Sequence, residues 1–396
     1  MLKNKKLLII TILLVFIPSL YSFAEEVEEG DIKITDKFIE EQLDSLNIKE
    51  LELVLEDIVK GNEFYFPKID IKETILSMIK GKDTFSIENV GKGLASIIFR
   101  EILGNLNLIS HILVIAVASG VLTNLQNAFE RDTVTKLAHY ATYIILSMLM
   151  INSFTLALEL GKKTVDQMVN FMQILLPILL TLLTAVGGPN TRLIFHPLII
   201  GIVNVIGSLI KGIVFPLIFF SFIIGVISNI SQKVQFSKLS ELMRQVIIVL
   251  VSASFTVFIG IITIYGLGAN VDGVTIRTAK FAVDSFVPII GKFLSDAVEA
   301  VVGFSAILKN GIGMVGLIAL FLICVAPAIK ITVLIFIYKT IAALIEPITS
   351  INASTCFNEV AKGLVLILVG LLSVATMFFI TITIIVGAGN TSLMFR

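Results

Sequence analysis

The sequence predicts an all-α membrane protein with about seven or eight transmembrane helices. Of its 396 residues, 56% are hydrophobic and only 15% are charged, and the mean hydropathy is +0.98. Several apolar runs exceed the roughly 18 residues that a helix needs to cross a bilayer. The formal net charge is zero and no basic run is present, which excludes the electrostatic footprint of a nucleic-acid-binding protein. We therefore expect a polytopic protein embedded in the lipid bilayer.

Residues 1–24 predict a signal peptide. The basic start MLKNKK precedes the apolar core LLIITILLVFIPSL, and the small residues Ser22 and Ala24 stand where a signal peptidase reads the chain. We expect cleavage after Ala24. An uncleaved anchor is the alternative, and both arrangements export the residues that follow.

Residues 25–100 predict a small exported helical domain. This segment is acidic, opens with EEVEEGD, and carries amphipathic patterns such as FIEEQLDSLNIKELELVLEDIVK. So short a segment buries only a modest core, so we expect it to rest on the membrane domain or on a partner. The GKGLAS sequence at 91–96 lacks the glycine spacing of a phosphate-binding loop.

Residues 101–396 predict the polytopic membrane domain. Apolar runs of helical length give the candidate spans 102–125, 138–158, 168–187, 193–210, 213–230, 246–268, 311–337 and 363–386. Lys211 and Gly212, with Pro216 just beyond, favour a hairpin between the fourth and fifth spans over one long helix. With an exported N-terminal domain, the loop around 231–245 is cytoplasmic, and its basic residues agree with that side.

Two connections are amphipathic, and two segments show a similar order of residues. Segments 231–245 and 338–363 carry charges on one side and apolar residues on the other, as helices lying in the membrane interface do. A shift of 111 residues places Pro216 on Pro327 and suggests a pairing of segment 168–245 with segment 283–363. This alignment predicts an internal repeat, a common construction in transport proteins, although apolar residues also align by chance.

The segment from Arg277 to Gly303 is too charged for lipid and too apolar for an ordinary loop. Pro288 and Gly291 divide it and are candidate hinges, as is Pro327 further along. One arrangement is an amphipathic hairpin lying flat on the exported membrane surface. The other is a re-entrant or subunit-facing segment that lines a water-filled path. The candidate pore-lining or subunit-contact residues are Arg277, Lys280, Asp284, Lys292, Asp296 and Glu299.

Nothing in the sequence predicts an enzyme, a metal site or a cofactor. The histidines His111, His139 and His196 are scattered, and two cysteines form neither a disulfide framework nor a metal-ligand cluster. Lys330 is a candidate intramembrane charge because it lies in an apolar run. Snorkelling of its side chain toward the inner surface is the alternative that we prefer.

Several stretches resemble the stage III sporulation protein AE family of endospore-forming bacteria. They are DGVTIRTAKFAVDSFVPIIGKFLSDAVEAVVG, KNGIGMVGLIALFLICVAPAIKI, YKTIAALIEPI, SVATMFFITITIIVGAGN and LLPILLTLLTAVGG with the FHPLI that follows. The resemblance runs through most of 168–390, and its most specific part is 272–303. The exported segment is similar only in kind, being acidic and preceded by a signal peptide.

This resemblance implies a component of the channel, or feeding apparatus, between mother cell and forespore. It implies a multi-pass location in the mother-cell-derived membrane around the forespore. Its implied partners are other stage III A proteins, including a cytoplasmic ATPase, and indirectly stage II sporulation protein Q; a homo-oligomer is also compatible. Two other functions remain open: a secondary transporter of a small solute, and a membrane assembly scaffold that conducts nothing. The family provides no catalytic residues to carry over.

Overall fold

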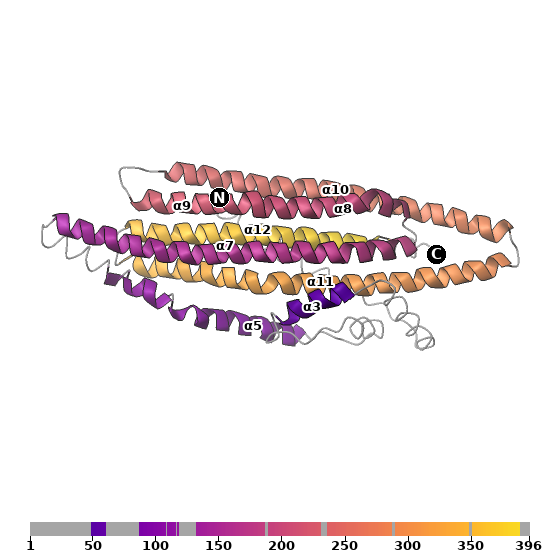
Figure 1. The fold of residues 1–396 in the computed structure, drawn as a ribbon, viewed down its shortest axis with the longest axis horizontal. Coiled ribbons are helices and arrows are strands. Elements are labelled where there is room, and N and C mark those ends of the chain that lie inside the picture. The colour runs from indigo at the N-terminus through magenta and orange to yellow at the C-terminus, as the bar shows by residue number, and fades with distance from the viewer. Residues whose placement is uncertain are drawn as a thin grey trace.

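The computed structural model describes residues 49–60, 87–107, 109–115, 117–118, 132–186, 189–230, 236–286, 290–347 and 351–388. Within these ranges the chain is helical, as predicted (Figure 1). The predicted signal peptide, residues 1–24, lies outside the described residues, as does most of 25–100. The helices are α3 (Lys49–Lys60), α5 (Ile87–Gly104), α7 (Asp132–Ala185), α8 (Pro189–Leu209), a π-helical turn η2 (Ile210–Val214), α9 (Phe215–Ile230), α10 (Ser237–Phe286), α11 (Ile290–Ile345) and α12 (Ile351–Gly387).

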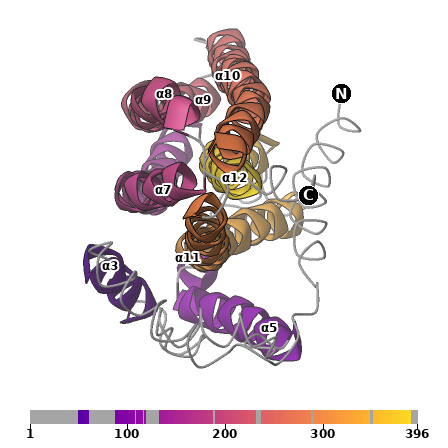
Figure 2. The same ribbon diagram turned by 90° about the vertical axis from the view of Figure 1, so that its right-hand side faces the viewer.

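The long helices form an antiparallel bundle whose axis is the long axis of the molecule (Figure 1). Helix α12 lies inside the bundle and packs against α7, α9, α10 and α11 (Figure 2). In its most apolar window 67% of the residues are buried, whereas α10 lies at the edge with only 22% buried. The two helices therefore meet different surroundings although both are apolar.

Glycines let α12 approach its neighbours closely. A Cβ added at Gly363 would lie 2.6 Å from Phe154 Cε2, and one added at Gly313 of α11 would lie 2.1 Å from Val386 Cγ2. Phe154 in turn stacks on Phe222 of α9 with ring centroids 3.9 Å apart. Small residues at helix contacts are the usual means of close packing where lipid removes the hydrophobic drive between helices.

Five helical segments in the described residues are long and apolar enough to cross a membrane: Tyr143–Ala185, Pro197–Ser228, Ser237–Ile264, Val301–Ile345 and Ser354–Gly387. A sixth exists if Ala95–Gly104 and Ile109–Ile115, which are bent by 43° relative to each other, form one span. The predicted seven or eight are thus not confirmed. The number is lower because two pairs of predicted spans are each one continuous helix.

The predicted hairpin between 193–210 and 213–230 is wrong, because α8, η2 and α9 continue as one helical rod. A proline ring collides with the carbonyl four residues earlier in an α-helix, here that of Gly212. The π-helical turn at Ile210–Val214 lies directly before Pro216, and the N–H of Phe215 bonds to Ile210 O, five residues back. A π-turn widens the helix locally, so the chain continues past Pro216 without reversing.

Helix α7 likewise joins the predicted spans 138–158 and 168–187. Its 54 residues include the charged stretch around Lys162 and Lys163, which lies between the two predicted spans. Lys163 is exposed and Lys162 half-buried, so the helix places these charges on its outer side and needs no break there. At 1.5 Å per residue α7 is about 81 Å long, well over twice the roughly 30 Å of a bilayer core.

The described part of the N-terminal segment rests on the bundle, as expected for a domain with so small a core. Helix α3 packs against α7 and α11, and its Leu51 is completely buried in the common core. Helix α5 packs against α11, and Ile97 is also buried. Because α5 continues to Gly104, the predicted boundary at residue 100 falls inside a helix.

Candidate functional site

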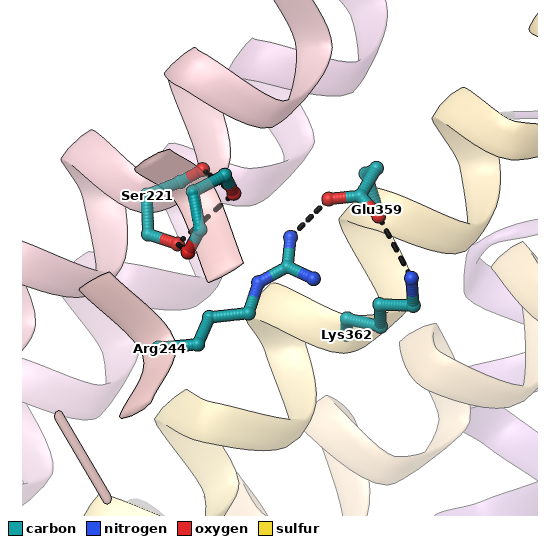
Figure 3. A network of polar contacts seen from close by, with 5 residues as sticks. Ser221, Arg244, Glu359 and Lys362 are labelled. Atoms are coloured by element: carbon teal, nitrogen blue, oxygen red, sulfur yellow. Dashed lines mark hydrogen bonds and ion pairs between the residues drawn. The ribbon is translucent and has the colours of Figure 1, made fainter. Parts of the chain in front are cut away.

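A buried ion pair joins α10 to α12 near one end of the bundle (Figure 3). Arg244 Nη2 donates to Glu359 Oε2, and Lys362 Nζ donates to Glu359 Oε1 at 2.8 Å. The side chains of Arg244 and Glu359 are only 17% and 10% exposed, while that of Lys362 is 57% exposed. Glu359 thus accepts two charge-assisted bonds, one from the mostly buried Arg244 and one from the more exposed Lys362.

Helix α9 provides the space and the polar contacts beside this pair. A Cβ at Gly225 would lie 2.6 Å from Glu359 Oε2 and 3.4 Å from Arg244 Nη2, so a larger residue there would push on the carboxylate. Ser240 Oγ donates to Ser221 O at 2.8 Å, and Ser221 Oγ donates to Ser240 O at 3.1 Å, which joins α9 to α10 twice (Figure 3).

Helix α7 joins the same network through Tyr143. Its hydroxyl donates to Val226 O of α9 at 3.2 Å and contacts Cys356 Sγ of α12. Cys356 is one helical turn before Glu359, so the two α12 side chains lie on the same side of their helix. Four helices are therefore linked by polar contacts at one level of the bundle.

We call Ser221, Ser240, Arg244, Glu359 and Lys362 the α9–α10–α12 network. Its Arg244 and Glu359 lie inside candidate membrane helices, where water is scarce and an unpaired charge is costly. Paired, they hold α10 against α12; separated, they would leave two buried charges uncompensated. The arrangement is suited to holding the helices together and to linking the position of α10 to that of α12, and it includes no nucleophile next to a base.

The sequence did not predict this network, and the interfacial helices that it predicted here are wrong. Segments 231–245 and 338–363 were expected to lie flat in the interface, but their described residues belong to the ends of long helices: α10 starts at Ser237, α11 ends at Ile345 and α12 starts at Ile351. Their polar sides exist because Arg244 and Glu359 face each other. The sequence did contain a signal for this site. Arg244 is the eighth residue of α10 and Glu359 is the ninth residue of α12, so each is a charge within an apolar helix.

A second buried charge, Lys309 of α11, was also not predicted from the sequence. Its side chain is completely buried, and its Nζ donates to the carbonyl of Ala388, just past the last residue of α12. The last carbonyls of a helix have no partner within the helix and carry partial negative charge, so a lysine there is stabilising. Lys309 therefore caps the end of α12.

Lys330, the predicted intramembrane charge, is less enclosed than Lys309. Its side chain is 46% exposed, and its Nζ lies 4.0 Å from Glu101 Oε2 of α5. Asn105 Nδ2 donates to the main-chain O of Glu101 at 2.8 Å and to its Oε1 at 3.3 Å. Lys330 thus contributes to the attachment of the N-terminal segment to the bundle.

The predicted pore-lining residues lie on the extensions of two long helices. Arg277, Lys280 and Asp284 are on α10, and Lys292, Asp296 and Glu299 are on α11, but their side chains lie outside what the structure describes. Candidate hinge Pro288 lies outside the described residues, between the end of α10 at Phe286 and the start of α11 at Ile290.

The two extensions project beyond the rest of the bundle as an antiparallel helical pair (Figure 1). Gly291 is the second residue of α11, which continues unbroken through the third candidate hinge, Pro327. Among the residues that the structure describes, no group of three or more histidine, cysteine, aspartate or glutamate side chains is placed to hold a metal ion.

Comparison with known proteins gives one consistent result. The model of the family described as stage III sporulation protein AE matches residues 69–389, and hence every candidate membrane helix. Stage III sporulation protein AE of Bacillus subtilis (strain 168) is 36% identical over 326 residues, which is 82% of this chain and 82% of the relative. No solved structure matches the chain.

Proposed function

Because the chain belongs to the stage III sporulation protein AE family, we propose that it is a multi-pass component of the channel, or feeding apparatus, between mother cell and forespore. The family match supports this most strongly, since it covers four-fifths of the chain and all five candidate membrane helices. We place the protein in the mother-cell-derived membrane around the forespore. Its proposed partners are other stage III A proteins, including a cytoplasmic ATPase, and indirectly stage II sporulation protein Q.

The α9–α10–α12 network favours a second candidate, a secondary transporter. Transporters use buried charges within membrane helices, and this chain has such a charge at Glu359 of α12. The apolar runs of the sequence contain few carboxylates, which disfavours this function. Glu359, which is 10% exposed within a candidate span, supplies one.

Deletion of the gene in its spore-forming host tests the proposed function. We expect development to stop after engulfment while vegetative growth stays unchanged, because the channel acts only then. The measurement is the number of heat-resistant spores, with the wild-type gene restored at another locus as control. Heat-resistant spores at the normal frequency would refute the proposal. A defect in vegetative growth, when no spores are being formed, would favour the transporter.

The continuous helices alter the proposed topology less than expected. Joining 193–210 to 213–230 removes one crossing, and joining 138–158 to 168–187 within α7 removes another. Because the two changes cancel, the connection before α10 keeps its predicted cytoplasmic side if the N-terminal segment is exported and Ala95–Gly104 with Ile109–Ile115 forms the sixth span. Only the region around Arg192 changes side.

Cysteine labelling tests this topology. Single cysteines at Ser45 and Ser237 are made in a chain carrying Cys324→Ala and Cys356→Ser, where the serine keeps a polar atom beside Tyr143. An impermeant thiol reagent should label position 45 from outside and position 237 only after the cells are opened. The reverse pattern in intact cells contradicts the topology.

A further inference from the structure

The outer side of α7 is polar along the middle of a candidate membrane helix. Between Glu159 and Gln173 every exposed side chain is charged or carries an amide, at spacings of three or four residues that bring them onto one side of the helix. At 1.5 Å per residue this stretch is about 21 Å long. We call it the α7 polar face; its members are Glu159, Lys163, Gln167, Asn170 and Gln173.

Helix α8 and the π-helical turn extend this polar surface. Lys211 Nζ pairs with Asp166 Oδ1 of α7 at 2.5 Å, and both side chains are almost half exposed, at 45% and 47%. Two turns further along α7, Gln173 Nε2 donates to Asn204 Oδ1 at 2.5 Å. The polar surface therefore spans two helices that lie next to each other (Figure 2).

No position of the bilayer along α7 avoids these residues. The candidate span runs from Tyr143 to Ala185, 43 residues, whereas a bilayer core needs only about 20. Every window of that length within the span contains at least one member of the α7 polar face. Charged and amide groups exposed to hydrocarbon are costly, so this side of α7 does not face lipid.

The same residues are poorly suited to a dry contact with another protein. The cores of protein interfaces are depleted in charge and centred on aromatic or aliphatic anchor residues. The α7 polar face has no such anchor, and Asp166 and Lys211 beside it already satisfy each other while remaining half exposed. Water is the environment that best suits these charged and amide side chains.

We propose that the α7 polar face lines a water-filled path within the assembled membrane complex. This inference rests on the proposed function, because other subunits must close the path on the side opposite α7. The charges on the α7 polar face and beside it are of both signs: Glu159 and Asp166 are negative, and Lys163 and Lys211 are positive. The path accordingly suits small hydrophilic solutes and does not select one sign of charge.

Reaction of single cysteines with a charged, water-soluble methanethiosulfonate reagent tests the proposal. Lys163, Asn170 and Gln173 are each replaced by cysteine in the chain carrying Cys324→Ala and Cys356→Ser. Matched controls are Val249→Cys and Val257→Cys, exposed on the apolar side of α10. The measurement uses membranes that contain the assembled complex, and each variant must first reach the wild-type protein level in those membranes, which shows that it folds and inserts.

We expect the three α7 cysteines to react at least about tenfold faster than the two α10 cysteines, because the reagent needs a hydrated thiolate. Equal, slow reaction at all five positions, with α7 labelled only by a lipid-soluble maleimide, would place the α7 polar face in lipid. Protection from both reagents would place it in a dry protein contact. Either result overturns the proposal.

The labelling result is separable from the fate of the proposed function. If the α7 cysteines fail to react while the deletion strain still arrests after engulfment, only the water-filled path is lost. If they react rapidly but the deletion strain sporulates normally, the path stands and the sporulation role is rejected.

Discussion

Two exposed sides of this bundle, on α7 and on α10, have opposite chemistry. From Val246 to Ile264 the exposed residues of α10 are Val, Ile, Ala, Gly, Ser and Thr, without a charge or an amide. Both threonine hydroxyls on this side bond within the helix: Thr256 Oγ1 donates to Ser252 O at 2.9 Å, and Thr263 Oγ1 to Ile259 O at 2.7 Å. This side suits lipid, whereas the α7 polar face does not.

A side chain exposed on this bundle can therefore face either of two environments in the membrane. On α10 exposure marks contact with lipid, and on α7 it marks a surface that needs water. The two helices also differ in attachment, because α7 packs against α8, α9, α11 and α12 while α10 lies at the edge. Helix α10 therefore depends more on the α9–α10–α12 network.

The largest expected effect comes from Glu359→Ala, which removes what holds α10 and leaves Arg244 charged and buried. Loss of one partner of a buried pair costs about 3–5 kcal/mol in free energy of unfolding. Thermal unfolding in detergent should show this loss, and Glu346→Gln, at an exposed glutamate, is the matched control. Arg244→Met combined with Glu359→Met should be less destabilised than Glu359→Met alone; equal losses would mean that the two charges are not coupled.

Substitution by lysine on the exposed side of α10 and, separately, on the α7 polar face compares the surroundings of the two helices directly. Val257→Lys puts a charge into lipid and should cost about 2.5–3.5 kcal/mol of insertion free energy. Asn170→Lys, on the α7 polar face, should be tolerated because the charge stays in water. Protein level in the membrane fraction measures both, and equal depletion of the two variants would remove the distinction.

Gly225→Ala should have an intermediate effect. Its Cβ would lie 2.6 Å from Glu359 Oε2, so the carboxylate must move away from Arg244. Such overpacking costs about 1–3 kcal/mol. Gly201→Ala on α8, where nothing lies within 4 Å of an added Cβ, is the control, and both are followed by thermal unfolding. Identical melting temperatures for the two variants would show that Gly225 is not needed for the network.

Asp166→Asn should have the smallest effect on stability. The Asp166–Lys211 pair is almost half exposed, and exposed pairs contribute under about 1 kcal/mol in water. In lipid the same substitution would leave Lys211 unpaired at low dielectric and cost several times more. A small change in melting temperature therefore supports water at this surface, and a change as large as that of Glu359→Ala argues against it.

The sequence predicted where apolar helices lie better than where they end. The predicted spans between 138 and 386 overlap the five candidate membrane helices, because hydrophobicity over about 20 residues is a local property. Lys211 and Pro216 were read as a break, but a π-helical turn accommodates the proline. The predicted spans 138–158 and 168–187 left Lys162 and Lys163 between them, but α7 continues through both lysines.

The candidate sites were harder to predict, for two physical reasons. Arg244 and Glu359 are 115 residues apart, and nothing local shows that they meet. The α7 polar face was visible as positions 159, 163, 167, 170 and 173, whose spacing is helical. It was missed because the helix was divided within this stretch, so that the periodicity was never followed across it.

The difference between the two sides can be measured with spin labels at Asn170 and Val257 in membranes containing the assembled complex. Collisions with a water-soluble nickel chelate and with oxygen, which concentrates in lipid, report the surroundings of each label. We expect the nickel chelate to dominate at Asn170 and oxygen to dominate at Val257. Oxygen-dominated relaxation at both positions would contradict the account, because both sides of the bundle would then face lipid.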